Sequence, residues 1–372
     1  MTKVMLRDHY CTEEIHTNNK EKILLLSSRP FERSGMTKIE VDVINNTLDN
    51  FDFDVASFEY NEEYVELLKS KGISIYKLPD KKHILSYIRN IYKIVIEGKY
   101  KKVYIHGNSP LMFLEALPSK LAGAKVITHC HNGKPQKKLL IYYVLKPFFN
   151  CILDYKIACS KTAADWAYYG GYTVITNGID INRFKYNKDV RKTMRQELGL
   201  TEEYVVGHIG NFNEQKNHKK LISIFKEIIK VKPDSKLVLI GEGKLKKSIE
   251  EDVKKKRLSD KVLFIGYVND PENYLQAMDV MIIPSLFEGF CLAALEAQVS
   301  GLPVVVSDKV PDEALVADCC AKLKLEEENE KWAEKALEMI NKDRKDNSKL
   351  LYEKGYALDH MTDFIKDILL KT

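Results

Sequence analysis

The sequence predicts an α/β fold built from two Rossmann-like, doubly wound domains. Short apolar, β-branched segments alternate with amphipathic segments along the whole chain, which is the pattern of parallel βαβ units. The pattern restarts after Asn177-Gly178, a turn dipeptide that is followed by the charged stretch Lys185–Glu197. A length of 372 residues also exceeds what one hydrophobic core usually holds, which favours two domains.

Each half of the chain is expected to hold parallel strands joined by helices. The expected strands are 23–28, 53–58, 73–76, 102–106, 125–129 and 155–159, then 205–209, 236–240, 262–265, 280–283 and 303–306. The expected helices include 35–48, 83–96, 110–122, 136–150, 219–231, 245–256 and 292–299. Residues 350–372 have helical spacing and are too long for a strand, so we expect one C-terminal helix there. Two such domains would bind a ligand in a cleft at the carboxyl ends of their sheets.

Composition and charge exclude several classes of protein. Hydrophobic residues make up 45% and charged residues 30% of the chain, so it is neither disordered nor fibrous. The formal net charge of +5 is too small for a protein that coats nucleic acid. The basic run Lys244–Arg257 contains Glu–Lys pairs four residues apart, so we expect a solvated helix there and no nucleic-acid partner.

Cysteine usage and hydropathy favour a cytoplasmic location. The seven cysteines are scattered and form no C-x-x-C pair, so neither a disulfide framework nor a zinc ribbon is expected. Residues 1–22 lack the apolar core of a signal peptide. The chain has no run of apolar residues long enough to span a bilayer.

The most informative motif follows the expected strand 280–283. A loop with Glu288 and Gly289 leads into a helix, whose N-terminus provides unpaired N–H groups and the positive end of a dipole for an anion. Gly289 lacks a Cβ atom, so a phosphate group could approach its backbone closely. Glu296 follows within the second helical turn, roughly 12 Å along the helix axis from Glu288. This spacing suits two carboxylates that bind hydroxyl groups on either side of a diphosphate.

The segment resembles the E-x7-E signature of the retaining glycosyltransferases of family 4, which have the GT-B fold. Similar blocks follow in the family's order at 158–160, 176–180 with Phe184, 207–218, 241–243, 264–266 and 301–304. The resemblance covers essentially the whole chain and is strongest over residues 172–313. Within the family, the chain looks most like bacterial transferases that build capsular polysaccharides and exopolysaccharides. The signature alone would be a weak signal, because glutamates at this spacing are common on solvated helix faces.

The resemblance assigns roles to the residues around this helix. It implies that Glu288 binds hydroxyl groups of the donor sugar and that Glu296 binds the ribose of the nucleotide. A carboxylate suits a vicinal diol because it accepts two hydrogen bonds at fixed spacing. The donor-binding segment Gly289, Phe290, Cys291 and Leu292 lies between the two glutamates.

A second site follows the strand 205–209. Family members usually have Gly-Arg five residues before a lysine, and these two cations bind the donor diphosphate. Here the lysine is Lys216, but Asn211 stands in the place of the arginine. We expect Lys216 to stabilise the departing diphosphate, and Lys219 or Lys220 are candidates to replace the missing cation. Alternatively, Lys216 is a solvated lysine at a helix start.

The third and fourth sites lie in the first half of the chain. The resemblance implies a histidine near the reacting carbon of the sugar. We assign this position to His131, and His129 is the reserve candidate. A His-x-His pair could also ligate a metal, or either histidine could simply be hydrogen-bonded at a strand end. The resemblance also implies that Gly35 approaches the donor phosphate, although Ser34 could equally be a helix N-cap.

Two shorter patterns have weaker functional interpretations. Asp52-Phe53-Asp54 matches the D-x-D string of metal-dependent transferases, but it opens an expected strand and both carboxylates should lie on one exposed face. Gly241-Glu-Gly243 follows a strand but lacks the third glycine of a nicotinamide-binding loop.

The resemblance implies a hexosyltransferase that moves a hexose or N-acetylhexosamine from a nucleotide sugar to a lipid-linked oligosaccharide with retention of configuration, and UDP is the expected nucleotide. The nucleotide sugar would bind the second domain, residues 179–351. The acceptor would bind the first domain, which consists of residues 1–178 and the C-terminal helix 352–372 that crosses back to it. No metal or other cofactor is expected. A UDP-sugar 2-epimerase of similar fold and a non-catalytic nucleotide-sugar-binding subunit are the alternatives.

The segment Lys134–Phe149 combines lysines with many apolar residues. One interpretation is a helix buried in the core of the first domain. The other is peripheral contact with the cytoplasmic leaflet of the membrane, where Lys137 and Lys138 would meet anionic lipid.

Overall fold

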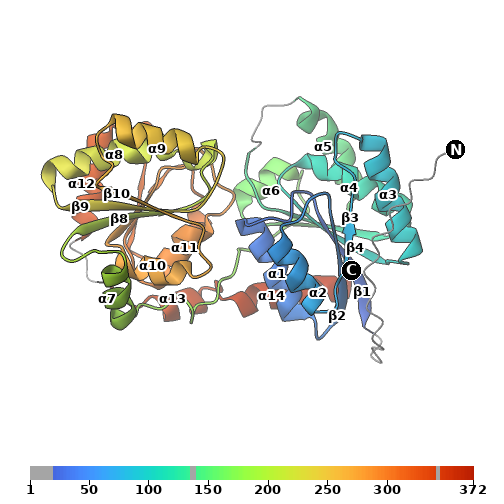
Figure 1. Cartoon of the computed structure of the whole chain (residues 1–372). Helices are drawn as coiled ribbons and strands as arrows, with labels where there is room; N and C mark the ends of the chain where they lie inside the picture. Colours follow the sequence, from blue (N-terminus) through green and yellow to red (C-terminus); the bar gives the residue numbers. More distant parts are fainter. Residues whose placement is uncertain (1–19, 135–139, 341–343) are drawn as a thin grey trace. The chain divides into compact units, whose positions relative to one another are not determined.

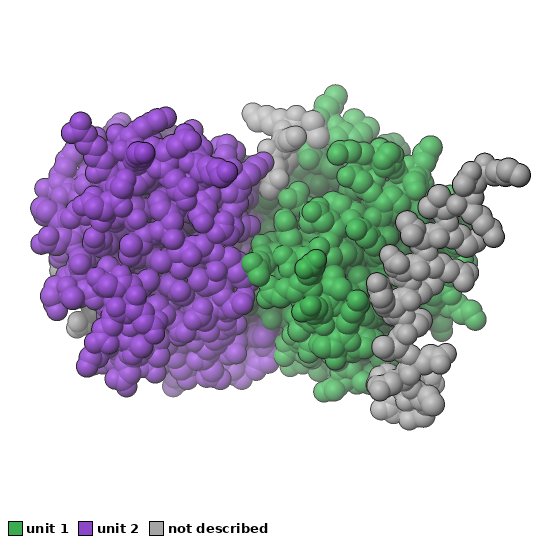
Figure 2. All heavy atoms as spheres, in the orientation of Figure 1, with its two compact units in different colours: residues 1–158, 163–174, 362–372 green, residues 159–162, 175–361 purple. Residues whose placement is uncertain are grey.

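The computed structural model describes residues 20–134, 140–340 and 344–372. The chain forms two compact units, which Figure 2 colours separately. Unit 1 contains residues 1–158, 163–174 and 362–372, and unit 2 contains residues 159–162 and 175–361. Each unit has one parallel sheet with flanking helices (Figure 1), which confirms the predicted α/β class.

Unit 1 is built on a seven-stranded parallel sheet with the order β3-β2-β1-β4-β5-β6-β7. Its strands are β1 (Glu21–Ser27), β2 (Phe51–Ser57), β3 (Ser74–Lys77), β4 (Lys102–Gly107), β5 (Lys125–Cys130), β6 (Tyr155–Ala158) and β7 (Thr173–Val174). Its helices are α1 (Gly35–Thr47), α2 (Glu62–Ser70), α3 (Ile84–Glu97), α4 (Phe113–Leu121), α5 (Ile141–Ile152) and most of α6 (Lys161–Ala167). Helices α3, α4 and α5 lie side by side on one face of this sheet, and α1 and α2 lie on the other (Figure 1).

Unit 2 is built on a six-stranded parallel sheet with the order β10-β9-β8-β11-β12-β13. Its strands are β8 (Tyr204–Ile209), β9 (Ser235–Ile240), β10 (Val262–Gly266), β11 (Val280–Ile283), β12 (Val304–Ser307) and β13 (Cys320–Leu323). Its helices are α7 (Lys188–Glu197), α8 (His218–Val231), α9 (Lys246–Lys255), α10 (Pro271–Ala277), α11 (Leu292–Val299), α12 (Asn329–Ile340), α13 (Ser348–Glu353) and the first turn of α14 (Leu358–Lys371).

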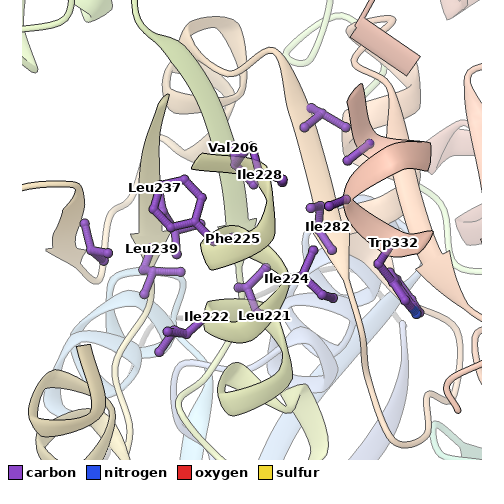
Figure 3. Packing of buried hydrophobic residues seen from close by; sticks show 14 of the residues in the cluster. Val206, Leu221, Ile222, Ile224, Phe225, Ile228, Leu237, Leu239, Ile282 and Trp332 are labelled. Carbon is purple, nitrogen blue, oxygen red and sulfur yellow. The ribbon is translucent and has the colours of Figure 1, made fainter. Parts of the chain in front are cut away.

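The core of unit 2 lies between its sheet and the helices α8 and α12. Phe225 of α8, Leu239 of β9, Ile282 of β11 and Trp332 of α12 are completely buried and pack together (Figure 3). Full burial of each such side chain contributes about 1.5–3 kcal/mol to stability. The strands of this sheet are covered on both faces, which explains why they read as continuous apolar runs.

Both sheets have a topological switch point, where the connections leave in opposite directions. In unit 1 it lies between β1 and β4, and in unit 2 it lies between β8 and β11. Loops at the carboxyl ends of these strands diverge, so each unit has a place where a ligand can reach backbone groups. The loops after β8 and β11 contain the predicted diphosphate and sugar residues.

The C-terminal segment differs from the single helix that we predicted. It forms two helices, α13 and α14, because the chain turns at Gly355, whose φ of +83° is accessible to glycine but strained for other residues. The chain then enters unit 1, where Lys102 Nζ donates to Leu369 O at 2.5 Å. The return of the C-terminal helix to the first unit was expected.

Two strands were not predicted, and one helix begins later than expected. The edge strand β13 was not predicted, because its residues are only partly buried and a lysine interrupts the apolar pattern. The short strand β7 was also missed. Residues 135–139 of the helix expected at 136–150 lie outside the described residues, as do Lys137 and Lys138, and α5 begins at Ile141.

Candidate active site

The loops that follow β8 and β11 are bound to each other in unit 2. The Leu286 N–H donates to the Gln215 carbonyl at 2.8 Å, and the Asn217 side chain donates to the Pro284 carbonyl at 3.1 Å. Asn217 lies between a short 3-10 turn, Glu214–Lys216, and the start of α8. Its φ of +53° lets the chain change direction between the two. This turn directs residues 215 and 216 toward the loop that contains Glu288.

Lys216 and Glu288 form an ion pair at the centre of this loop pair. Lys216 Nζ lies 2.7 Å from Glu288 Oε1, and Gln215 Nε2 donates to Glu288 Oε2 at 3.1 Å. The Glu288 side chain is only 5% exposed and the Lys216 side chain 17%. Burial by itself would lower the pKa of Lys216, but Glu288 and other nearby acidic groups outweigh this effect and raise it above its usual value. Lys216 is therefore a charged, nearly buried group, and not a solvated lysine.

Helix α11 begins immediately after this loop, as predicted. Its N-cap residue, Cys291, makes no side-chain cap hydrogen bond and has a φ of +87°. A non-glycine residue in this region costs of the order of 1–3 kcal/mol and is typical of functional loops. Burial raises the pKa of the Cys291 thiol to about 12, so this cysteine is not an activated nucleophile. Glu296 lies in the second turn and is buried.

The loop between Glu288 and α11 is fixed by the chain around it. Ser160 Oγ donates to the Gly289 carbonyl at 2.6 Å. The ring of Phe290 stacks on Tyr356, with centroids 6.4 Å apart. Ser307 Oγ donates to the Ser285 carbonyl at 2.7 Å. The resulting backbone geometry leaves the first turn of α11 without a side-chain cap, which is the arrangement that binds anions at helix N-termini.

Glycines bring a third loop against the turn after β8. A Cβ atom on Gly241 would lie 2.2 Å from the Gly210 carbonyl oxygen, and one on Gly243 would lie 2.6 Å from the Phe212 carbonyl oxygen. The Phe212 N–H also donates to the Glu242 carbonyl at 2.9 Å. The Gly-Glu-Gly string therefore supports the loop that contains Asn211, a role that the sequence pattern did not indicate.

The cation that would replace the missing arginine is not Lys220. Its Nζ donates to the Glu327 carbonyl at 2.9 Å and lies 5.8 Å from the centre of the Trp332 ring, so it belongs to the packing of α8 on α12. Lys219 and Asn211 are both exposed. Lys216 is the predicted site lysine that contacts Glu288.

In unit 1, three histidines lie together at the carboxyl ends of β4 and β5. His106 of β4 pairs in register with His129 of β5, and His131 follows His129 by two residues. His106 Nδ1 lies 2.9 Å from His131 Nε2, and Tyr104 Oη lies 2.9 Å from His129 Nδ1. Burial lowers the pKa of His131 to about 3, and it lowers the pKa values of His106 and His129 well below 6.5. All three imidazoles are therefore neutral at physiological pH.

The three histidines are the candidate metal ligands among the described residues. One nitrogen of each ring lies within 4.8 Å of the others. The rings of His129 and His131 are tilted by 33°, with centroids 4.1 Å apart. His106 and His131 face each other through a hydrogen bond. This geometry fits a hydrogen-bonded unit better than a coordination site.

The remaining predicted residue of unit 1 is Gly35. It is the exposed first residue of α1, and Ser34 Oγ accepts from the Thr37 N–H at 3.2 Å. The N-cap interpretation of Ser34 is therefore correct. Gly35 still presents its backbone at a helix N-terminus, which is the position that the phosphate role requires.

The D-x-D string has a structural role that differs from our expectation of an exposed pair. Asp54 is buried and forms an ion pair with Lys22 at 2.7 Å. Tyr100 donates a further hydrogen bond to the same carboxylate. Asp54 on strand β2 is therefore packed inside unit 1 and does not contact solvent.

Sequence reasoning missed Gln215 and His106 as members of the two sites. Gln215 lies next to Lys216, and only the turn geometry shows that its amide reaches Glu288. His106 and His129 are each the last residue but one of their strands, so the rule that parallel strands end at one edge could have linked them.

Comparisons with known proteins identify the class of this protein. Residues 190–356 match the family model described as "Glycosyl transferases group 1". The putative glycosyltransferase EpsF of Bacillus subtilis is 28% identical over 288 residues, which cover 73% of this chain and 75% of EpsF. The UDP-Gal:α-D-GlcNAc-diphosphoundecaprenol α-1,3-galactosyltransferase of Escherichia coli is 30% identical over 254 residues, which cover 64% of each chain.

Solved structures show the same fold. The crystal structure of Anabaena HepE in complex with UDP-glucose has a TM-score of 0.81 at 20% identity and covers 94% of this chain and 100% of HepE. WaaG, a glycosyltransferase involved in lipopolysaccharide biosynthesis, has a TM-score of 0.74 at 16% identity over 93% of this chain and 99% of WaaG. The chain is a glycosyltransferase with the GT-B fold. Its residues 190–356 belong to the glycosyl transferases of group 1.

Proposed function

We propose that this enzyme transfers a hexose or N-acetylhexosamine from a UDP-linked donor to a lipid-linked oligosaccharide during synthesis of a bacterial capsular polysaccharide or exopolysaccharide. The Escherichia coli relative is named for a UDP-sugar donor and a diphosphoundecaprenol-linked acceptor. A further relative from Campylobacter jejuni, 28% identical over 135 residues, is named for transfer to a diphospho-undecaprenol glycan. HepE was crystallised with UDP-glucose.

The Lys216–Glu288 pair at the start of α11 is the observation that supports this proposal most directly. When the bond to the sugar breaks, negative charge develops on the departing diphosphate. Lys216 and the N–H groups of α11 would stabilise that charge more strongly in the transition state than in the bound donor. Glu288 is a buried carboxylate beside the same spot and would accept hydrogen bonds from sugar hydroxyl groups.

We further propose that the transfer needs no metal and retains the configuration of the donor. Lys216 and the helix N-terminus supply the positive groups that a metal provides in other transferases. For retention, the acceptor hydroxyl would attack the face from which the diphosphate leaves, and a diphosphate oxygen would take the hydroxyl proton. This route uses no covalent intermediate on a protein carboxylate.

We also propose that unit 1 touches the cytoplasmic leaflet of the membrane through helix α5. This helix buries only Tyr142 and Phe149, whereas Tyr143, Val144 and Phe148 are half or more exposed. The interpretation of α5 as a fully buried core helix is therefore wrong. No helix among the described residues is long and apolar enough to cross a membrane.

The neighbouring helices α3 and α4 also have exposed apolar residues. Leu85 of α3 is 85% exposed and Leu121 of α4 is 68% exposed. Arg89 and Lys93 are exposed on α3 as well. A surface that combines basic and apolar side chains fits an anionic bilayer, because the basic side chains attract the headgroups and the apolar side chains enter the membrane interface. We propose a cytoplasmic enzyme that is peripheral to the membrane.

The donor and the reaction can be tested with purified enzyme. UDP- and GDP-sugars are incubated with an undecaprenyl-diphosphate-linked sugar, with and without EDTA, and the anomeric configuration of the product is read by NMR. We expect an α-linked product from an α-linked UDP-sugar, formed equally well with EDTA. Release of an epimerised sugar without acceptor would identify an epimerase, and UDP binding without any turnover would identify a non-catalytic subunit.

Paired lysine variants separate site chemistry from general charge. Lys216→Met should lower kcat at least 100-fold, since the diphosphate loses its cation. Lys226→Met removes an exposed lysine further along α8 and should leave kcat within about twofold. Equal effects of the two variants would contradict the role of Lys216.

Membrane contact can be tested by flotation with vesicles that contain anionic lipid. Val144→Glu on α5 should reduce vesicle binding at least fivefold. Val231→Glu, at an exposed valine of α8 in unit 2, is the matched control and should bind as the wild type does. Unchanged binding of the Val144 variant would refute the proposal for α5.

A further inference from the structure

The loop of residues 289–291, which leads into α11, contains a strained residue. Cys291 has a φ of +87°, and its side chain caps no N–H group of the helix. The Cys291 carbonyl nevertheless accepts from the Ala294 N–H at 3.1 Å, so the strained residue closes the first turn of α11. A strained backbone persists only where the surrounding structure determines it. Contacts from outside the loop must therefore keep Cys291 in place.

Phe290 is the large side chain of this loop and is only 2% exposed. Its ring stacks on the ring of Tyr356, with centroids 6.4 Å apart and planes that differ by 30°. Aromatic rings at such a separation attract each other beyond the effect of the apolar area that they bury. Because Phe290 directly precedes Cys291, a fixed ring at residue 290 restricts the backbone of the strained residue.

Tyr356 lies in the segment between α13 and α14, and three hydrogen bonds fix it. Its hydroxyl donates to the Glu313 carbonyl at 2.7 Å, and its N–H donates to the Leu351 carbonyl at 3.0 Å. Its own carbonyl accepts from the Ile179 N–H at 3.1 Å. Burial raises the pKa of the Tyr356 hydroxyl, and Glu313 adds to this effect, so the hydroxyl remains a donor at physiological pH. The Tyr356 ring is therefore anchored at both of its ends.

The backbone that follows Tyr356 is packed against residues 178 and 179. Ala357 forms a parallel bridge with Ile179, and the Leu358 N–H donates to the Ile179 carbonyl at 3.0 Å. Gly178 allows this close approach, because a Cβ atom there would lie 2.7 Å from the Ala357 carbonyl oxygen. The last stretch of unit 2 begins at residue 175 and ends at residue 361. The support of Phe290 thus stands where the two ends of that stretch are bound together.

We propose that Tyr356 is a positioning residue for the loop 289–291: its ring holds Phe290 and thereby keeps the N-terminus of α11 in the conformation that binds the donor diphosphate. This role rests on the proposed function. The loop and Tyr356 both belong to unit 2. The donor site therefore depends on a residue that follows the sheet of unit 2 in the sequence and lies outside the motifs around Lys216 and Glu288.

Amide hydrogen exchange measures this role without any activity. The Ala294 and Leu295 N–H groups both donate to the Cys291 carbonyl, so their exchange rates report whether the loop keeps its conformation. Tyr356→Leu removes the ring, whereas Tyr356→Phe keeps the ring and removes only the hydroxyl. We expect these two amides to exchange at least tenfold faster in the Leu variant and within threefold of the wild type in the Phe variant. Amides of β9 should exchange at the wild-type rate in both variants.

UDP binding, measured by calorimetry, tests the consequence for the donor. Tyr356→Leu should weaken UDP binding about tenfold, and Tyr356→Phe should stay within about threefold of the wild type. Tyr352→Leu is the matched control, because Tyr352 is a half-exposed tyrosine of α13, and this variant should bind UDP as the wild type does. Equal UDP affinities of the two Tyr356 variants would refute the role of the ring.

The outcomes also separate the positioning role from the proposed function. If the wild-type enzyme does not bind UDP, then the proposed function is wrong, and the exchange rates of Ala294 and Leu295 still decide the role of Tyr356. If the enzyme transfers sugar but Tyr356→Leu leaves these rates unchanged, then the function stands and the positioning role is wrong. If the Leu variant does not fold, Phe290→Leu removes the stack from the other ring and gives the same comparison.

Discussion

Lys216 Nζ lies 2.7 Å from Glu288 Oε1, so the two residues expected to bind the donor also bind each other. Glu288 is buried and Lys216 nearly so, and Glu288 is the main charge that acts on Lys216. A donor diphosphate must therefore compete with Glu288 for the lysine, and the sugar hydroxyl groups must compete with the lysine for the glutamate. The pair keeps both side chains oriented until the donor arrives.

The first prediction concerns the stability of this pair. Glu288→Gln leaves the Lys216 ammonium buried without its counter-charge, and breaking a buried pair in this way typically costs about 3–5 kcal/mol. We expect a lower Tm and a loss of turnover. In Lys216→Met/Glu288→Gln both charges are absent, so the double variant should be more stable than the sum of the single effects predicts. Additive Tm changes would show that the two side chains do not interact.

The second prediction concerns Asn211. This residue is exposed on the loop after β8 and stands where the family usually has arginine. Asn211→Arg should bind UDP about three- to tenfold more tightly at low ionic strength, because a second cation can meet the diphosphate. Calorimetry at rising salt concentration should show this gain decreasing. A gain that is independent of salt would point to a cause other than charge.

The third prediction concerns the backbone at Cys291. Its φ of +87° is strained for any residue with a Cβ atom. Cys291→Gly relieves this strain, whereas Cys291→Ala removes the thiol and keeps the strain. The glycine variant should therefore be about 1 kcal/mol more stable than the alanine variant in urea unfolding. The opposite order would mean that the flexibility of the unfolded glycine chain outweighs the strain.

The fourth prediction concerns Glu40, a completely buried carboxyl group of α1. Burial raises its pKa from 4.5 to about 8, although the Ser27 hydroxyl partly opposes this. The folded chain then keeps a proton that the unfolded chain loses above pH 4.5. Stability should fall as the pH rises from about 4.5 to 8, and the loss is complete above the folded pKa.

Glu40→Gln removes this dependence because glutamine does not titrate. The variant should melt several degrees above the wild type at pH 8.5, and the difference should diminish toward pH 5. Thermal melts across this range give the comparison. A constant Tm difference would show that Glu40 does not change its protonation in this interval.

The fold was largely predictable because parallel strands covered on both faces leave a strong local pattern. The strand Val280–Ile283 and the helix Leu292–Val299 match their predicted bounds, since each is framed by a proline, a glycine or a turn. The break at Gly355 was also marked in the sequence by a glycine at the end of a helix. The helical spacing of the residues on both sides outweighed that signal in the prediction.

The site was predictable residue by residue but not as a set of contacts. The positions of Glu288 and Lys216 follow from their motifs, yet their pairing depends on the turn at Asn217, which has no distinctive local pattern. His106 and His131 belong to different strands, and their contact requires the register between β4 and β5. The exposure of α5 depends on which face the neighbouring helices leave uncovered, and hydrophobic content alone does not reveal it.

Unit 1 is not a continuous piece of the sequence, and this affects how the enzyme can be shortened. The residues after 361 belong to it, and Ile365 and Leu369 are completely buried. A stop codon placed before them would expose apolar surface of the N-terminal unit and leave the Lys102 ammonium without the Leu369 carbonyl. Shortened variants must therefore keep residues 362–372, because their removal would damage the half of the enzyme encoded first.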